Sequence, residues 1–316
     1  MAAYRVLSLD GGGIRGIITV VLLKRLAAEP GLGGWLDEVD LIAGTSTGGL
    51  LALGIARGLD LGAIEDLYLT KGRAIFDDSW LDNVVDLGKV IGANYSLKGL
   101  TRELQQVLGE TTTLGDLATR VLVATFDLDN VDDPGRGAGE PRTWKPKLFH
   151  NFPGEGSDAG ALAWKVGLYT AAAPTYFPSY EGYVDGGVYA TNPAMCALAQ
   201  ALDSRYGPPA TLDDVVLLSI GTGTNLQYIP RKTVDWGYAQ WARPMLTLML
   251  DGVSGIADFQ CRQILGTRYQ RLAPVFPAGT TYTMDDVEHV AAMHAFASGI
   301  DLSQTAAWLR AHWMTP

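Results

Sequence analysis

Short apolar runs alternate along the chain with segments of helical periodicity. Runs rich in Val, Leu and Ile predict buried strands over residues 4–9, 39–45, 120–126 and 215–220, with one further strand near 147–151. Apolar positions three and four residues apart predict helices over residues 17–28, 49–57, 60–71, 97–108 and 193–203. This alternation is typical of a three-layer α/β/α fold, in which helices cover both faces of a mostly parallel sheet.

Two regions depart from the alternating pattern. Residues 130–160 contain six Gly and four Pro, which predicts a long surface excursion rather than a domain linker. The segment from about residue 234 onward is predicted to be helical. We therefore expect residues 1–316 to form a single domain.

Composition and charge narrow the classes of function. The chain has 316 residues, 47% of them hydrophobic, and a net charge of −10, which argues against a nucleic-acid partner and against attraction to an anionic membrane. Its longest uncharged run, 41–56, is too short and too rich in glycine to span a membrane. The first predicted strand leaves no room for a secretory signal, so we expect a cytoplasmic protein. Cys196 and Cys261 lack metal-ligand spacing, so neither a disulfide framework nor a metal site is expected.

The sequence GTSTG, residues 44–48, places a serine between a predicted strand and a predicted helix. The spacing of Gly44, Ser46 and Gly48 is typical of a nucleophile turn, because only small residues on either side of the serine let the backbones pass closely. Ser46 is therefore the candidate nucleophile, and it needs a base within hydrogen-bonding reach.

A second glycine-rich turn, in LSLDGGGIRG, also joins a strand to a helix. Gly11, Gly13 and Gly16 fit the spacing of a dinucleotide-binding loop, but no acidic residue ends the second strand to bind a ribose, which disfavours a nucleotide-dependent oxidoreductase. The favoured interpretation is an oxyanion hole formed by the backbone N–H groups of Gly11, Gly12 and Gly13.

The base could be a histidine or an acidic residue. His150, His289, His294 and His312 are the histidines of the chain, and none of them lies in a glycine-flanked loop of catalytic appearance. Asp185, in YVDGGVYATNP, follows an apolar strand position and precedes two glycines and a capped helix. A carboxylate in such a loop could accept the proton of the serine directly, although Asp-Gly-Gly by itself is a common turn.

DGGGIRG, GTSTGG and DGG, in this order, resemble the three signature blocks of patatin-like acyl hydrolases, which share their core with the catalytic domain of cytosolic phospholipase A. The stretches ATFDLDN, AAAPTYFPSY, ATNPAMCAL and LLSIGTGT are also similar to family blocks, and YQRLAPV is similar to a stretch of bacterial members. The resemblance implies a dyad of Ser46 and Asp185 without histidine, an oxyanion hole at Gly11, Gly12 and Gly13, and no metal or cofactor. The supporting motif positions are Asp10, Arg15, Gly16, Gly44, Gly48, Gly186 and Gly187.

The expected function is hydrolysis of lipids or of medium-chain to long-chain acyl esters, with transient contact to a membrane or micelle. A weakly active storage or scaffold protein of the same family remains an alternative. Arg15 is expected either to anchor its loop to a carboxylate, which is favoured, or to meet an anionic group of the substrate. Two aromatic-rich segments, 75–95 and 234–250, are the candidate acyl groove or cover. Their bulky residues are Phe76, Trp80, Leu81, Trp236, Trp241 and Leu246.

Overall fold

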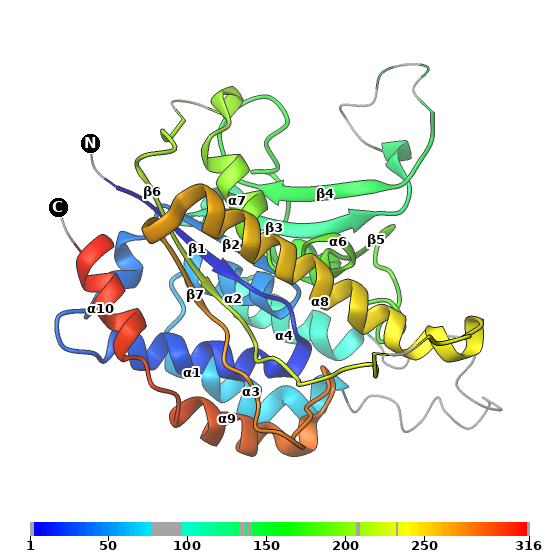
Figure 1. Ribbon diagram of the computed structural model, residues 1–316. Coiled ribbons are helices and arrows are strands. Elements are labelled where there is room, and N and C mark those ends of the chain that lie inside the picture. Colours follow the sequence, from blue (N-terminus) through cyan, green and yellow to red (C-terminus); the bar gives the residue numbers. More distant parts are fainter. Residues whose placement is uncertain are drawn as a thin grey trace.

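A seven-stranded mixed sheet forms the centre of the computed structural model, which describes residues 3–76, 97–132, 137, 139, 141–206, 209–231 and 233–314. The strands of this described part are β1 (Tyr4–Leu9), β2 (Leu41–Thr45), β3 (Arg120–Asp127), β4 (Lys145–His150), β5 (Tyr183–Asp185), β6 (Val215–Ile220) and β7 (Tyr269–Leu272). Their spatial order is β4-β3-β2-β1-β6-β7, and β5 also pairs with β3. Figure 1 shows the strands crossing the middle of the molecule, with both chain ends on the same side.

Strand direction divides the sheet into two parts. β3, β2, β1, β6 and β7 are mutually parallel, whereas β4 and β5 run antiparallel to β3. The carboxyl ends of β1 and β2 therefore lie at the same edge of the sheet, which is where ligands bind in open α/β folds. The two glycine-rich turns found in the sequence both follow these strand ends.

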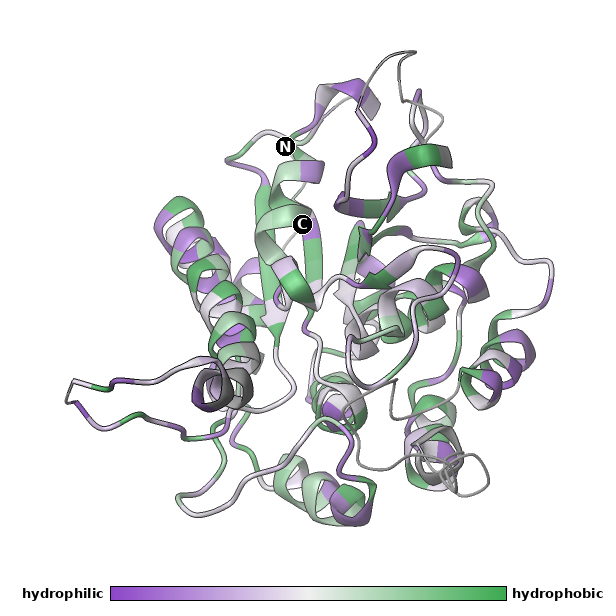
Figure 2. Ribbon diagram, turned by 90° about the vertical axis from the view of Figure 1, so that its right-hand side faces the viewer, coloured by the Kyte–Doolittle hydropathy of each residue, from purple (hydrophilic) through white to green (hydrophobic). Residues whose placement is uncertain are grey.

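Helices cover both faces of the sheet. The longer helices of the described residues are α1 (Gly16–Ala27), α2 (Thr47–Ala56), α3 (Leu61–Phe76), α4 (Lys98–Leu108), α5 (Ala163–Ala171), α7 (Ala194–Ala201), α8 (Tyr238–Leu265), α9 (Val290–Ser298) and α10 (Ser303–His312). Adjacent residues of one strand point to opposite faces: Val6 packs in a core with α7 and α8, whereas Leu7 packs in a larger core with α1, α2, α4 and α5. Figure 2 shows the apolar strands enclosed between the two helical layers.

The predicted elements are largely present. The four principal predicted strands correspond to β1, β2, β3 and β6, and the strand near 147–151 corresponds to β4. The prediction that the segment after residue 234 is helical is wrong at one place, because β7 forms there and pairs with β6. The predicted excursion 130–160 contains β4, and residues 133–136, 138 and 140 of it lie outside the described residues. A single domain stays a prediction.

Candidate active site

Ser46 lies at the turn between β2 and α2. Its backbone has φ 55° and ψ −127°, a left-handed conformation that is strained for a residue with a side chain. The Ser46 N–H donates to Oγ1 of Thr170 at 2.8 Å, and this hydroxyl donates to the carbonyl of Ala124 at 2.7 Å. α5 and β3 therefore hold the strained turn in place.

The glycines around Ser46 permit close backbone contacts. A Cβ atom at Gly48 would lie 2.2 Å from the carbonyl oxygen of Leu9, so only glycine lets α2 begin directly against β1. A Cβ atom at Gly44 would lie 2.1 Å from the carbonyl oxygen of Gly48 within the same turn. The predicted steric reason for the G-x-S-x-G spacing is thus visible in the structure.

Asp185 meets Ser46 because two strands end head to head beside β3. β2 ends at Thr45, which pairs with Ala124, and β5 ends at Asp185, which pairs with the next residue of β3, Thr125. β4 occupies the other edge of β3 along this stretch, so β5 must lie on the same side of β3 as β2. Because β2 and β5 run in opposite directions, the residue that follows β2 comes next to the residue that ends β5.

The Asp185 carboxyl group is buried, and its partners are neutral. Its Oδ1 accepts the N–H of Gly187 at 2.7 Å. Burial raises the pKa of Asp185 from 3.8 to about 6, and hydrogen bonding from the Ser46 side chain and from the Gly187 N–H opposes this rise. A carboxylate with a raised pKa is a stronger base than an exposed one, which suits a group that has to accept a proton.

The glycine loop after β1 lies against Ser46. A Cβ atom at Gly11 would lie 3.3 Å from Cβ of Ser46. One amide of the predicted oxyanion hole is already engaged, because the Gly11 N–H donates to the carbonyl of Thr191 at 2.9 Å. The N–H groups of Gly12 and Gly13 have no acceptor within the described part of the chain. The donors left for a ligand are therefore two rather than the three expected.

Steric contacts explain why the loop contains consecutive glycines. A Cβ atom at Gly12 would lie 2.1 Å from Oγ1 of Thr222, and one at Gly13 would lie 2.1 Å from the carbonyl oxygen of Met284. Thr222 also donates its hydroxyl hydrogen to the carbonyl of Gly11 at 2.9 Å. The loop after β6 thus fixes the backbone of the glycine loop from one side.

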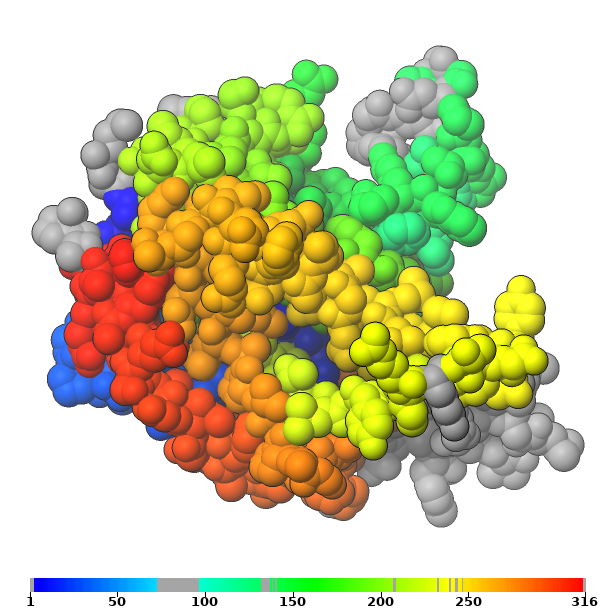
Figure 3. Space-filling model, in the orientation of Figure 1, coloured from blue at the N-terminus to red at the C-terminus, as the bar shows by residue number. Residues whose placement is uncertain are grey.

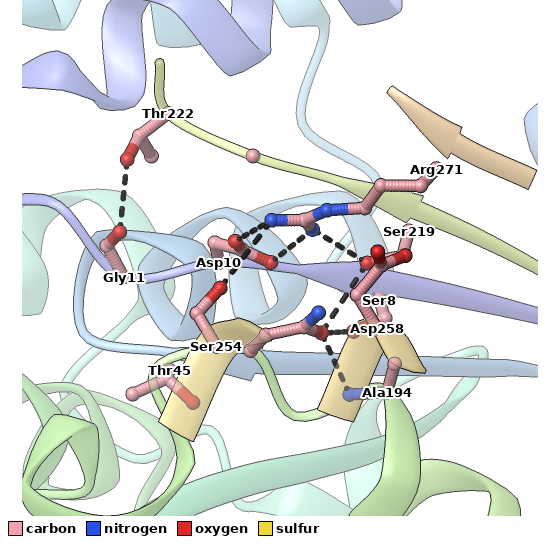
Figure 4. Close-up of polar contacts among 12 residues, drawn as sticks. Ser8, Asp10, Gly11, Thr45, Ala194, Ser219, Thr222, Ser254, Asp258 and Arg271 are labelled. Carbon is pink, nitrogen blue, oxygen red and sulfur yellow. Dashed lines mark hydrogen bonds and ion pairs between the residues drawn. The ribbon is translucent and has the colours of Figure 1, made fainter. Parts of the chain in front are cut away.

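Asp10 is held by an arginine from the far end of the chain (Figure 4). Nη1 of Arg271, on β7, donates to Oδ1 of Asp10 at 2.8 Å and to the hydroxyl of Ser219 at 2.7 Å. Asp10 is buried and the Arg271 side chain is only 12% exposed. Burial alone would lower the pKa of Arg271, but Asp10 raises it. Arg271 is an anchor of the glycine loop that sequence reasoning missed. YQRLAPV was the available signal.

Arg15 does not have the predicted carboxylate anchor. Its Nε donates to the carbonyl of Gly12 at 3.4 Å, and no carboxylate of the described residues lies within ion-pair distance of its guanidinium. Burial lowers its pKa, and the charges of Asp251 and Tyr176 are the largest effects that oppose this lowering. Arg15 lines a cavity beside Ser46 instead, so its charge faces the space available to a ligand.

The other motif glycines support the packing of these turns. A Cβ atom at Gly16 would lie 2.2 Å from Oγ1 of Thr47, and one at Gly186 would lie 2.4 Å from the carbonyl group of Ala124. Gly187 supplies the N–H group that binds Asp185. These positions therefore bring α1 and the turn after β5 close to the serine turn.

Two cavities meet at Ser46. The polar cavity, of about 190 Å³, is bordered by Asp10, Gly12, Arg15, Asp185 and residues of α8. The apolar cavity, of about 150 Å³, lies between α2, α3 and α4. Figure 3 shows the surface hollowed beside α8, with the dark blue of the N-terminal segment at the bottom of the hollow.

The histidines lie elsewhere. None of them lines either cavity in the described part of the chain. His150 packs on Tyr206, His289 hydrogen-bonds Asp286 and His294 hydrogen-bonds Glu65. The geometry therefore offers Asp185, and no histidine of the described residues, as the partner of Ser46.

The described residues contain no arrangement that indicates metal or disulfide chemistry. Cys196 and Cys261 are free thiols. Among the described residues, no group of three His, Cys, Asp or Glu side chains is arranged to hold a metal ion. None of the helices described is long and apolar enough to cross a membrane.

Of the two aromatic-rich segments, only 234–250 can be compared with the expected groove. Residues 77–96, with Trp80 and Leu81, lie outside the described residues, as do the side chains of Phe76 and Leu246. Trp236 and Trp241 pack edge-to-face against each other with ring centroids 5.1 Å apart, and neither lines a cavity beside Ser46. The apolar cavity is lined mainly by apolar residues of other segments, including α2, α3 and α4.

Sequence comparisons agree with this arrangement. The family described as Patatin-like phospholipase matches residues 7–198, which include the serine turn, the glycine loop and Asp185. Protein teg of Priestia megaterium is 27% identical over 99% of this chain and its own full length. The cGAMP-activated phospholipase of Vibrio cholerae is 34% identical over 69% of this chain and 64% of its own length. Patatin-2-Kuras 4 of Solanum tuberosum is 31% identical over 89% of this chain and 81% of its own length.

Solved structures are more distant. VipD from Legionella pneumophila is 13% identical, with a TM-score of 0.42, over 99% of this chain and 67% of that chain. The sequence matches place the chain in a class of lipid acyl hydrolases with an α/β fold. Within that class, it belongs to the patatin-like phospholipase family.

Proposed function

We propose that the chain is a serine acyl-ester hydrolase that acts on lipids or acyl esters through a dyad of Ser46 and Asp185. The observation that carries the proposal is the head-to-head meeting of β2 and β5, which brings a strained serine to a buried carboxylate. The names of the relatives support a lipid substrate. No cofactor takes part in the proposed reaction.

The reaction proceeds in two halves. Asp185 accepts the proton of the Ser46 hydroxyl while Oγ attacks the ester carbonyl carbon, and the N–H groups of Gly12 and Gly13 stabilise the resulting oxyanion. The tetrahedral intermediate collapses, the alkoxide leaves with the proton from Asp185, and Ser46 carries the acyl group. Water then attacks the carbonyl carbon of the acyl-enzyme while Asp185 accepts a proton from it. The second tetrahedral intermediate collapses, the bond to Oγ of Ser46 breaks, Oγ takes the proton back from Asp185, and the carboxylic acid is released.

Contact with a lipid surface is part of the proposal. α8 exposes Met245, Leu248 and Met249, whereas Thr247 and Leu250 of the same turns line the polar cavity. Exposed apolar side chains beside a cavity are typical of a surface that meets lipid. An enzyme resting on this part of α8 would have the cavity close to the lipid from which it takes a substrate.

Covalent labelling tests the assignment of the nucleophile. An alkyl fluorophosphonate should add one phosphonyl group to Ser46, because the glycine-loop amides stabilise the tetrahedral adduct. Intact mass and peptide mapping locate the label. Ser46→Ala should abolish both the label and ester hydrolysis, whereas His150→Gln, His289→Gln, His294→Gln and His312→Gln should each retain them. A label on another residue, or a histidine variant that folds and is inactive, would contradict the dyad.

A further inference from the structure

The apolar cavity has no assigned role beyond its position beside Ser46. It is lined mostly by apolar residues, among them Leu50 and Leu51 of α2, Leu67 of α3 and Leu104 of α4, and the charged side chains of Lys71 and Glu103 also border it. We propose that this cavity holds the acyl chain of the substrate and that its floor limits the preferred chain to medium length, about six to ten carbons. The inference rests on the proposed function, since it concerns the acyl group attacked by Ser46.

Helix contacts define the mouth of the cavity. α2 and α3 run in opposite directions, and near the serine the hydroxyl groups of Thr47 and Tyr68 are hydrogen-bonded to each other. One turn further along α3, a Cβ atom at Gly72 would lie 2.7 Å from Cδ1 of Ile14, which follows the glycine loop. The end of the cavity beside Ser46 is therefore the end that the glycine loop borders.

Contacts at the other end of α2 define the floor. A Cβ atom at Gly54 would lie 3.3 Å from Cδ1 of Leu59 and 3.3 Å from Cδ1 of Ile64. Ile64 begins the second turn of α3 and is 5% exposed, so this end is closed by packed side chains. An acyl chain that entered at Ser46 would run along α2 and stop at Gly54.

Two estimates give the length of chain that fits. Ser46 and Gly54 are eight residues apart, which is about 12 Å along a helix. A fully extended hydrocarbon advances about 1.3 Å per bond, given single bonds of about 1.5 Å, and so reaches the floor at about nine carbons. Separately, a cavity of about 150 Å³ is the size that holds a six-carbon ring in another protein interior.

The two cavities differ in polarity and therefore suit different parts of the ester substrate. The apolar cavity can bury methylene groups, and each one buried is worth about fourfold in kcat/KM. Its two charged lining residues, Lys71 and Glu103, are paired with each other at 3.1 Å. The polar cavity contains Arg15 and Asp251, which form no ion pair among the described residues, so an alkyl chain placed there would desolvate charged groups without compensation. The acyl chain therefore belongs in the apolar cavity, and the alcohol part of the ester belongs in the polar one.

Hydrolysis of nitrophenyl esters from acetate to palmitate tests the proposal. For the wild type, kcat/KM should rise about fourfold per methylene up to about eight carbons and then level off or fall. Gly54→Ala raises the floor and should lower kcat/KM for decanoate about tenfold relative to butyrate. Ile64→Ala deepens the floor and should raise kcat/KM for dodecanoate about tenfold relative to octanoate.

Leu53→Ala is the matched control, because Leu53 is a fully buried residue of α2 that does not line the cavity. It should lose stability, as large-to-small core substitutions do, yet keep the wild-type chain-length profile. A profile that shifts equally in Leu53→Ala and Ile64→Ala would show general loosening and overturn the proposal. So would a wild-type optimum at acetate or at palmitate.

A binding experiment separates this inference from the proposed function. In the catalytically silent Ser46→Ala protein, octanoate should raise the melting temperature, and Gly54→Ala in the same background should weaken this effect. Stabilisation by octanoate without ester hydrolysis by the wild type would overturn the function and leave the cavity assignment standing. Ser46-dependent hydrolysis without any response to octanoate or to the floor variants would overturn the cavity assignment alone.

Discussion

At the scale of single residues, Asp185 combines burial with a task that requires a negative charge. Its partners are the Ser46 side chain and the Gly187 N–H, both neutral, so the charged form gains little compensation for the lost hydration. A raised pKa makes the carboxylate a better base and at the same time makes the folded protein less stable at neutral pH. Activity and stability are therefore opposed at this one position.

Asp185→Asn should accordingly change activity and stability in opposite directions. Because the amide cannot accept the proton, kcat/KM should fall at least thousandfold. The rise in pKa from 3.8 to about 6 corresponds to about 3 kcal/mol at pH 7. Removal of the charge should therefore increase the free energy of unfolding by up to that amount, measured by urea denaturation.

The stability difference between the wild type and Asp185→Asn should depend on pH. The folded state of the wild type binds the Asp185 proton more tightly than the unfolded state, so its contribution to stability is fully present below pH 3.8 and is lost as the pH rises through about 6. The advantage of Asp185→Asn should hence vanish near pH 4. The activity of the wild type should fall as the pH drops below about 6. An advantage that persists at pH 4 would contradict the assigned cause.

Arg15 is the second single residue whose charge matters, because its guanidinium borders the space available to a ligand. Its guanidinium borders the polar cavity, and its one hydrogen bond to the described residues is the 3.4 Å contact from Nε to the carbonyl of Gly12. Arg15→Ala should reduce kcat/KM for a phospholipid at least tenfold more than for a neutral nitrophenyl ester, because guanidinium groups bind phosphate oxygens by charge-assisted hydrogen bonds. Paired kinetics on the two substrates provide the measurement. An equal loss on both would indicate that Arg15 only supports the loop.

At the scale of elements, the site depends on strands that are far apart in sequence. β1 and β7 are joined by the Asp10–Arg271 ion pair across 261 positions of the chain. The same arginine donates to the hydroxyl of Ser219 on β6, so Arg271 connects β7 to β6 and to the residue that follows β1 (Figure 4). A buried ion pair of this kind adds little net stability, but either partner left alone is costly.

Removal of one partner should therefore cost more than removal of both. Arg271→Leu should lower the free energy of unfolding by about 3–5 kcal/mol, since it leaves the Asp10 carboxylate buried and unpaired. Asp10→Asn combined with Arg271→Leu should recover part of that loss, and a double-mutant cycle in urea measures the coupling. Additive losses in the cycle would show that the two side chains do not act as a pair.

The sequence predicted those parts of the site that arise from local geometry. Gly44, Ser46 and Gly48 act within one strand–turn–helix unit, so their spacing alone indicated the turn. Arg271 and Thr170 act through hydrogen bonds to residues that are far away in the sequence. No local sequence pattern predicts such contacts. β5 has three residues and β7 has four. Strands this short cannot be recognised from alternating hydrophobic and polar residues.

The expectation that Trp236 and Trp241 line an acyl groove is wrong for a related reason. Clustered aromatic residues such as Trp236 and Trp241 are conspicuous in a sequence, but they pack on each other. Most of the Leu and Ile residues that line the apolar cavity cannot be distinguished in the sequence from ordinary core residues. Whether such residues meet or leave a space between them is decided by how α2, α3 and α4 pack, which residue patterns do not specify.

At the scale of the whole molecule, charge and apolar surface act differently on a lipid substrate. The chain has 34 acidic and 24 basic residues, and its net charge is −10 at pH 7. The exposed side chains of Met245, Leu248 and Met249 provide apolar contact beside the polar cavity. Contact with lipid would therefore depend on apolar burial and be opposed by charge wherever the lipid surface is anionic.

Lipid composition and salt should hence control the rate together. Phosphatidylglycerol mixed into phosphatidylcholine vesicles should lower hydrolysis of phosphatidylcholine severalfold at about 10 mM salt, where charges act over about 30 Å. The rate should recover near 0.15 M salt, where this distance shrinks to about 8 Å. Hydrolysis of a water-soluble ester in the same buffers serves as the control and should not respond to the vesicles. Faster hydrolysis on anionic vesicles at low salt would show that a local basic surface, rather than the net charge, governs the approach to lipid.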